Sequence, residues 1–413
     1  MQVAGIIAEY NPFHHGHAYQ IQTLRKRYPD IRIVAIMSGS FTQRGAPVLL
    51  DKWTRAAHAV TGGVDLVLEL PFVFACRSAQ DFARGGISLL SRLGIVTHIA
   101  FGTEAEDITL LAAFAERIDT TPVQTRLREY LRQGCSYAGA LTYALKHDCK
   151  QAEATLRTPN NILAIEYLRA LRIRAPQILP IAIQRAAARH EETCLQEGIT
   201  SATSIRKALE ARHPPWEELK KTVMPTVWND LQTAHQGGIP CEDTLLILLR
   251  HLLLVTDASA LASYHGIHEG IENRLMRCAK TATEYRSFLA DVSTKRYPQS
   301  QIARLIVHLL LHLKKNQIHD FDTGGAAYIR PLAFNKYGRS LLRAFKEKSP
   351  LPIVTRTAEF LSEIPKKSTE CKTLHQMLSF DARATELRNL CLPTVHPMSS
   401  RTDFVMSPKF LSS

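Results

Sequence analysis

Residues 3–17 constrain this chain more than any other stretch, because they combine a buried strand, a sharp turn and a helix start. Val3–Ala8 is a short apolar run, typical of a strand inside a sheet. Asn11-Pro12 breaks the strand, and Gly16 lets the backbone approach a ligand closely because it has no Cβ. A helical pattern begins at His17. The stretch therefore predicts a strand–loop–helix junction.

His14 and His17 form an H-x-G-H sequence at this junction. The first N–H groups of a helix have no intrahelical partner and the helix dipole is positive there, which suits a phosphate group. Two imidazoles beside those groups can donate hydrogen bonds to phosphate oxygens as negative charge develops. The alternative is that both histidines serve only the turn and the cap. The position after a strand and before an amphipathic helix favours a nucleotide triphosphate site.

The composition is that of a globular protein with a basic surface. The 413 residues are enough for two or three domains, and the apolar fraction of 45% is ordinary. No apolar run is long enough to span a membrane and no signal-peptide pattern opens the chain, so we expect a cytoplasmic protein. The eight scattered cysteines form no C-x-x-C pair, and we name no metal-ligating residue. A net charge of +13 favours a polyanionic partner, most simply nucleic acid.

The first two hundred residues predict a doubly wound parallel α/β sheet. Helical patterns separate apolar runs at residues 3–8, 31–37, 64–70, 96–101 and 178–183. The last run contains Pro180, which has no backbone N–H, so we expect this run to be an edge strand. Ligands of such sheets lie beyond the carboxyl ends of the strands. The loops to inspect are therefore residues 9–17, residues 38–47 with Arg44, and the turn that begins at Gly102.

A second phosphate site is predicted at residues 201–206. Ser201, Ser204 and Arg206 stand at a helix start, where hydroxyls and a guanidinium can hold phosphate oxygens. A plain serine cap is the alternative. The helix ends at His213-Pro214-Pro215, which marks a domain boundary.

The chain after this boundary has an almost wholly helical pattern. We predict a sheet domain over residues 1–212, a helical domain over residues 213–391 and a loosely ordered polar tail over residues 392–413. Basic residues alternate with aromatic ones between residues 330 and 348, which suits RNA, although a solvated amphipathic helix explains the same stretch.

Several ordered blocks resemble the bacterial tRNA(Met) cytidine acetate ligases, a branch of the nucleotidyltransferase superfamily. The blocks are EYNPFHHGH (9–17), MSGSFTQRG (37–45), DKWTR (51–55), VDLVLELP (64–71), FGTE (101–104), PNNIL (159–163), SATSIR (201–206) and FNKYGR (334–339). The resemblance extends from residue 3 to about residue 345. It departs after Arg185, where relatives are glycine-rich and this chain has Ala-Ala-Ala-Arg-His190.

The resemblance implies an ATP-dependent enzyme that acetylates the wobble cytidine of elongator methionine tRNA to N4-acetylcytidine. Acetate would attack the α-phosphorus of ATP, and the cytidine amine would then attack the acetyl-adenylate. The implied ATP contacts are Ile7, Ala8, Glu9, Tyr10, Asn11, Pro12, Phe13, His14, His15, Gly16, His17, Ala18, Tyr19, Gln20, Gly102, Asn160, Asn161 and Arg185.

Roles for the remaining residues combine the resemblance with the residue chemistry. His14 and His17 would hold the α-phosphate and the leaving group, while Arg206, Ser201 and Ser204 would hold the β- and γ-phosphates. A magnesium ion is expected on the ATP phosphates. The predicted tRNA contacts are Arg169, Arg172, Arg174, Lys336, Arg339, Arg343 and Lys346.

Three alternatives stay open. A small-molecule adenylyltransferase shares H-x-G-H but needs no basic helical half. A relative of the aminoacyl-tRNA synthetases would need a lysine-rich K-M-S-K-S-like loop, and the sequence has none. A non-catalytic RNA-binding protein would not need His14, Gly16, His17 and Arg206 together. Neither a membrane nor a stable protein partner is implied.

Overall fold

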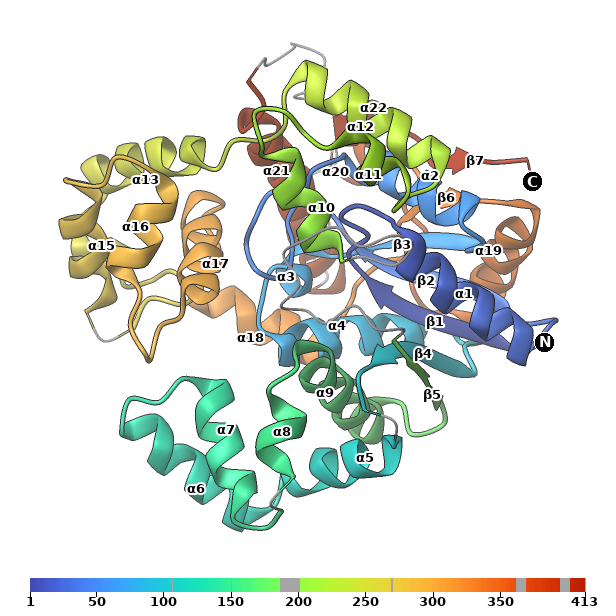
Figure 1. The fold of residues 1–413 in the computed structure, drawn as a ribbon, viewed down its shortest axis with the longest axis horizontal. Helices are drawn as coiled ribbons and strands as arrows, with labels where there is room; N and C mark the ends of the chain where they lie inside the picture. The colour runs from blue at the N-terminus through green and yellow to red at the C-terminus, as the bar shows by residue number, and fades with distance from the viewer. Residues whose placement is uncertain are drawn as a thin grey trace.

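One mixed sheet forms the centre of the molecule (Figure 1). The computed structural model describes residues 1–105, 107–149, 151–185, 201–268, 270–361, 369–393 and 402–412. The strand order in the sheet is β5-β4-β1-β2-β3-β6-β7. The strands are β1 (Val3–Ala8), β2 (Arg32–Ser38), β3 (Leu66–Leu70), β4 (His98–Thr103), β5 (Leu179–Gln184), β6 (Pro331–Phe334) and β7 (Lys409–Phe410).

The first five strands confirm the predicted doubly wound sheet. β2 pairs with β1 on one side, and β3 pairs with β2. On the other side, β4 pairs with β1, and β5 pairs with β4; all four pairings are parallel. β5, which contains Pro180, is the edge strand that the sequence predicts. The order reverses between β1 and β4, so the carboxyl ends of these two strands form the switch point where such sheets bind ligands.

Alternating side chains of the strands build two cores, one on each face of the sheet. Ile7 and Val34 belong to one core with α4 (Ala79–Arg92) and α9 (Pro159–Arg174). Ile6 and Ala35 belong to the other, together with α1 (His15–Arg27), α2 (Lys52–Thr61), α10 (Ala202–Leu209) and α12 (Pro225–Gly237). Burial on both faces explains why these strands are continuous apolar runs.

Two groups of helices project from this layered centre (Figure 1). The first is α5 (Ile108–Arg117), α6 (Thr121–Arg132), α7 (Tyr137–Lys146) and α8 (Ala152–Leu156). The second is α13 (Asp243–Val255), α14 (Ala258–Leu261), α15 (Ile271–Ala279), α16 (Tyr285–Val292), α17 (Gln299–Leu310) and α18 (Lys315–Gly324). The short helices α3 (Phe72–Ala75) and α11 (Trp216–Lys220) complete the chain before β6. No helix in the described ranges is both long and apolar enough to cross a bilayer.

The C-terminal part of the chain returns to the sheet. Its elements are β6, α19 (Lys336–Lys348), α20 (Thr357–Leu361), α21 (Thr369–Leu390), α22 (Thr402–Val405) and β7. β6 pairs antiparallel with β3, and β7 pairs parallel with β6. Residues 213–391 are mostly helical, as predicted, and β6 is the one named strand among the described residues of this range. The expectation of a loosely ordered tail is wrong for residues 402–412. The sheet takes strands from all three predicted segments, and their division into domains stays a prediction.

Candidate active site

The turn after β1 reverses the chain at the switch point of the sheet. Tyr10 has a left-handed backbone with φ of 48°, and the Asn11–Pro12 peptide bond is cis. The Asn11 side chain accepts a hydrogen bond from the Leu49 N–H (2.9 Å). Its backbone carbonyl accepts one from Arg206 Nη1 (2.7 Å). The turn is thus held from two directions before the helix begins.

His14 and His17 cap α1 with each other. His14 Nδ1 accepts a hydrogen bond from the Gly16 N–H (3.0 Å), and His17 Nδ1 accepts one from the His14 N–H (3.3 Å). The His15 N–H donates to the Thr222 carbonyl (3.1 Å). The first N–H groups of this helix are therefore occupied, and the prediction that they are free to meet a phosphate is wrong. The phosphate-binding capacity of the turn lies in its side chains instead.

The same contacts fix the protonation of both imidazoles. Since each Nδ1 accepts a hydrogen bond, the proton of each neutral ring is assigned to Nε2. Burial, together with neighbouring His17, Arg185, His15 and Arg206, holds the pKa of His14 well below its usual value. Burial and Arg185 lower the pKa of His17 to about 3. The rings lie 3.9 Å apart between centroids. The turn therefore presents two adjacent, neutral N–H donors.

Two arginines flank this pair. Arg185 follows β5, and its backbone N–H donates to the Thr103 carbonyl of β4 (3.0 Å). Its side chain lies beside Gly102, where an added Cβ would be 3.3 Å from Arg185 Cγ. Both Arg185 and Arg206 lower the pKa of His14 by their positive charge. The structure thus brings His14, His17, Gly102, Arg185 and Arg206 to one edge of the sheet.

The other predicted nucleotide contacts have local partners. Asn161 Oδ1 accepts hydrogen bonds from Thr103 Oγ1 (2.7 Å) and from the Glu104 N–H (3.1 Å). The Asn160 amide donates to the Glu104 carboxylate. Ser201 caps α10 by accepting from the Ser204 N–H (3.1 Å). These side chains shape the loops around the arginines, and their direct contact with ATP stays a prediction.

The predicted tRNA contacts lie on two surfaces. Arg169 and Arg172 both form ion pairs with Asp119, and Arg174 donates to the Asp322 carbonyl (3.0 Å). The four basic residues of the second surface are exposed on α19. α19 starts beside the first strand residues of β3, since the Asn335 N–H donates to the Asp65 carbonyl (3.0 Å). This surface is at the amino-terminal edge of the sheet, opposite the H-x-G-H turn, and its role stays a prediction.

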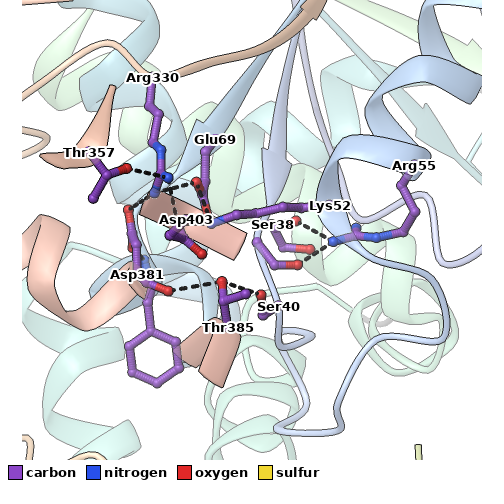
Figure 2. Close-up of polar contacts among 12 residues, drawn as sticks. Ser38, Ser40, Lys52, Arg55, Glu69, Arg330, Thr357, Asp381, Thr385 and Asp403 are labelled. Atoms are coloured by element: carbon purple, nitrogen blue, oxygen red, sulfur yellow. Dashed lines mark hydrogen bonds and ion pairs between the residues drawn. The ribbon is translucent and has the colours of Figure 1, made fainter. Parts of the chain in front are cut away.

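A buried charge cluster, which we call the Lys52 cluster, lies where α2 begins and β3 ends. It consists of Lys52, Glu69, Arg330, Asp381 and Asp403 (Figure 2). Lys52 Nζ contacts Glu69 Oε1 (2.7 Å) and Asp403 Oδ1 (2.8 Å). Arg330 contacts Glu69 Oε2 (3.1 Å) and the Asp403 carboxylate. Burial and the charge of Glu69 raise the pKa of Asp381 to about 7.

The Lys52 cluster touches the loop after β2. An added Cβ on Gly39 would be only 2.3 Å from Glu69 Oε1, so the loop backbone rests on this carboxylate. Arg55 holds the same loop: it is fully buried and donates to the carbonyls of Ser38 (3.0 Å) and Gly39 (Figure 2). In the sequence, Lys52 and Arg55 are recognised only as members of the DKWTR block. The signal that could have found them is a pair of cations on the apolar side of an amphipathic helix.

Carboxylates near the histidine pair form hydrogen bonds to other groups of the protein. Among the residues that the structure describes, no group of three or more His, Cys, Asp or Glu side chains could hold a metal ion. Glu9 accepts from the Gln43 N–H (2.6 Å), and Glu104 accepts from Asn160. The nearby carboxylates are thus engaged with the protein.

Comparisons with known proteins agree with this arrangement. The family model described as HIGH Nucleotidyl Transferase matches residues 1–403. A tRNA(Met) cytidine acetate ligase of Thermoanaerobacter sp. (strain X514) is 37% identical over 371 residues, which cover 88% of this chain and 91% of the relative. One from Syntrophomonas wolfei is 35% identical over 420 residues, covering 99% of each chain.

Two solved structures share the fold over their full length. The crystal structure of Thermotoga maritima TmcAL in an apo form superposes with a TM-score of 0.90 at 31% sequence identity, with 100% of both chains covered. A second structure of that protein, bound with alpha-thio ATP, gives a TM-score of 0.89 at 32% identity, again with 100% of both chains covered.

Proposed function

This chain belongs to the tRNA(Met) cytidine acetate ligase family of HIGH-type nucleotidyl transferases, and we propose that it activates acetate with ATP and acetylates the wobble cytidine of elongator methionine tRNA. The observation that carries the proposal is the pair of neutral imidazole donors, His14 and His17, between Arg185 and Arg206. The pair stands at the switch point of a doubly wound sheet, where nucleotides bind. We also propose that the reaction takes place in the cytoplasm, where ATP and tRNA are available.

In the first step, a carboxylate oxygen of acetate attacks the α-phosphorus of ATP and pyrophosphate leaves. Negative charge grows on the α-phosphate oxygens and on the leaving oxygen. The Nε2–H groups of His14 and His17 donate to these oxygens, and being already oriented they need no reorganisation during the reaction. Arg185 and Arg206 hold the outer phosphates as fixed positive charges. A neutral donor keeps its proton through the step, so acid–base exchange with the protein is unnecessary.

In the second step, the N4 amine of the cytidine attacks the carbonyl carbon of the acetyl-adenylate. The C–N bond forms, the bond to the adenylate oxygen breaks, AMP leaves, and the amine loses a proton. Both nucleophiles come from substrates, so the chain contributes position and charge. Ser201 and Ser204 serve the first turn of α10 and thereby the orientation of Arg206, which lies on the same helix.

We propose that a magnesium ion binds the phosphates of the ATP substrate, since phosphate oxygens and water are ligands that Mg²⁺ prefers. Among the described residues, the groups proposed to contact the phosphates are the guanidiniums of Arg185 and Arg206 and the Nε2–H groups of His14 and His17.

Acetate-dependent exchange of labelled pyrophosphate into ATP, without tRNA, tests the activation step. We expect exchange with acetate and loss of exchange when acetate is omitted. A small-molecule adenylyltransferase would exchange only with a different acceptor, and a non-catalytic RNA-binding protein would not exchange at all. Either result, from protein that is folded and binds ATP, would contradict the proposal.

A further inference from the structure

The loop after β2 presents one arginine from a rigid frame. The Thr42 N–H donates to the Ala46 carbonyl (2.9 Å), and the Gly45 N–H donates to the Thr42 carbonyl (3.0 Å). Gln43 Nε2 donates to the Arg77 carbonyl (2.8 Å). Between these fixed positions Arg44 is exposed, and within the described residues it has no hydrogen bond or ion pair. An unpaired guanidinium on an ordered loop beside an active site is available to a ligand.

This loop joins the site to the helical group of α13–α18. Gly45 has a φ of +89°, and an added Cβ would be 2.6 Å from the Arg304 N atom of α17. The two backbones are therefore in direct contact. Arg304 Nη1 reaches only the Gln43 carbonyl, at 3.4 Å, and the described part of the chain offers it no ion pair. Arg44 and Arg304 are thus neighbours on two elements that meet at the carboxyl edge of the sheet.

Three carboxylates near these arginines have other partners. Glu9 accepts from the Gln43 N–H (2.6 Å), and Asp81 pairs with Arg77 (3.1 Å). Glu210, which faces Arg206, pairs with Arg286 (2.6 Å). Burial lowers the pKa of both Arg206 and Arg304, and the positive charge of Arg44 lowers both further. The carboxylates of Glu9, Glu210 and Glu242 act on Arg206 in the opposite direction.

The loop after β2 joins the histidine turn to α17: the Gln43 N–H donates to Glu9 (2.6 Å), and Gly45 lies against the backbone of Arg304. We call the four guanidinium groups along this edge the arginine row: Arg185 and Arg206 beside the histidine pair, Arg44 on the loop and Arg304 on α17. The first two suffice to flank the phosphates of a nucleotide. The last two extend the positive row away from the histidines and onto a helix that carries no other part of the site.

We propose that Arg44 and Arg304 bind backbone phosphates of the RNA strand next to the target nucleotide, and this inference rests on the proposed function. A base inside a folded RNA must leave its stack to reach an adenylate at the sheet edge. Phosphate contacts on the flanking nucleotides hold the strand in register while the base is extruded, and they position more than they specify. The row is placed to do this because it starts at the reacting phosphate and leads outward.

The test measures tRNA binding and adenylate formation separately. Arg44→Ala and Arg304→Ala should each weaken binding of a methionine tRNA transcript by roughly five- to tenfold near 0.1 M salt and reduce the salt-dependence slope by about one. Acetate-dependent pyrophosphate exchange without tRNA should be unchanged. Arg44→Lys should restore most of the binding, because a phosphate contact of this kind needs the charge. Arg128→Ala is the matched control, because Arg128 is an exposed cation of α6 and is not among the predicted tRNA contacts.

Three results would overturn the inference. If both alanine variants bind tRNA with wild-type affinity and slope, the row ends at Arg206. If they lose exchange without tRNA to the same degree as binding, these arginines serve ATP and not RNA. If Arg128→Ala weakens binding equally, the effect is that of net charge. Failure of the wild-type protein to exchange pyrophosphate would instead contradict the proposed function, so the two failures are distinct.

Discussion

Replacing His14 with asparagine separates the two roles of this residue, which are to cap α1 and to donate a hydrogen bond to phosphate. His14 Nδ1 accepts the Gly16 N–H at the start of α1, whereas Nε2–H is the proposed phosphate donor. Asparagine places an amide oxygen close to the position of Nδ1 and is among the best N-cap residues. It has no atom at the position of Nε2. His14→Asn should therefore keep the helix start and remove only the donor.

Loss of the phosphate donor and loss of the helix cap differ in their free-energy cost. Loss of one preorganised donor to a developing oxyanion slows a reaction by about 10²- to 10³-fold, or about 2.7–4 kcal/mol. Loss of an N-cap costs about 1 kcal/mol of folding stability. We expect His14→Asn to lower the rate of acetate-dependent pyrophosphate exchange by two to three orders of magnitude (about 10²- to 10³-fold) with near wild-type stability at pH 7.5. His14→Ala should show the same rate loss and also lose stability.

The pH dependence of stability gives an independent check. The folded pKa of His14 is held well below its usual value, mainly by burial, while the unfolded value is about 6.5. Below about pH 6.5 the unfolded chain binds a proton that the folded chain does not, so acid destabilises the fold. Between pH 7.5 and pH 5.5, this one group should lower the free energy of unfolding of the wild-type protein by at most about 1.4 kcal/mol, the limit set by the unfolded pKa. His14→Asn should lose that much less stability over the same interval.

The assays are pyrophosphate exchange at saturating ATP and acetate, and urea unfolding at pH 5.5 and 7.5. His17→Asn is the companion variant, since His17 Nδ1 accepts the His14 N–H and its pKa is about 3. A folded His14→Asn protein with wild-type exchange would refute the assignment of Nε2–H as a phosphate donor. An unchanged pH dependence of stability would refute the neutral state of the ring.

Further predictions address the arginine, the buried cluster and the α19 surface. Arg206→Ala should raise the ATP concentration for half-maximal exchange at least about tenfold, and wild-type kinetics would reduce residues 201–206 to a helix cap. The pKa of Asp381 is raised to about 7, so the fold binds a proton that the unfolded chain releases near pH 4, and stability falls as pH rises through 7; Asp381→Asn should flatten this dependence in urea unfolding at pH 5.5 and 8. Neutralising Lys336, Arg339 and Arg343 together should weaken tRNA binding and leave exchange intact, and normal tRNA binding would show that RNA does not reach α19.

The sheet could be predicted from sequence because its strands are buried on both faces. β1, β2 and β3 contain runs with almost no polar residue, and such runs can be recognised in the sequence without knowing which strands they pair with. β6 was missed because its four residues lie inside a basic, aromatic stretch with a helical continuation. Its pairing with β3 depends on a contact between segments more than two hundred residues apart, which no local pattern encodes.

The candidate site shows the same division. The H-x-G-H turn is local, so its position at a strand–helix junction followed from its neighbours in sequence. The sequence could not predict that each imidazole both caps the helix and offers an N–H donor, because this depends on which ring nitrogen accepts the cap hydrogen bond. The Lys52 cluster could not be predicted from the sequence either. Lys52 and Asp403 are separated by 351 positions, and a lysine is expected on the surface unless its buried partners are known.

The full reaction provides the most direct test of the account. The protein would be incubated with ATP, labelled acetate and unmodified elongator methionine tRNA, and the tRNA would be digested to nucleosides. We predict label in N4-acetylcytidine, dependent on ATP and absent from a tRNA whose wobble cytidine is replaced by uridine. Label that does not enter cytidine, or that enters the wobble-uridine tRNA equally, would contradict the proposed function.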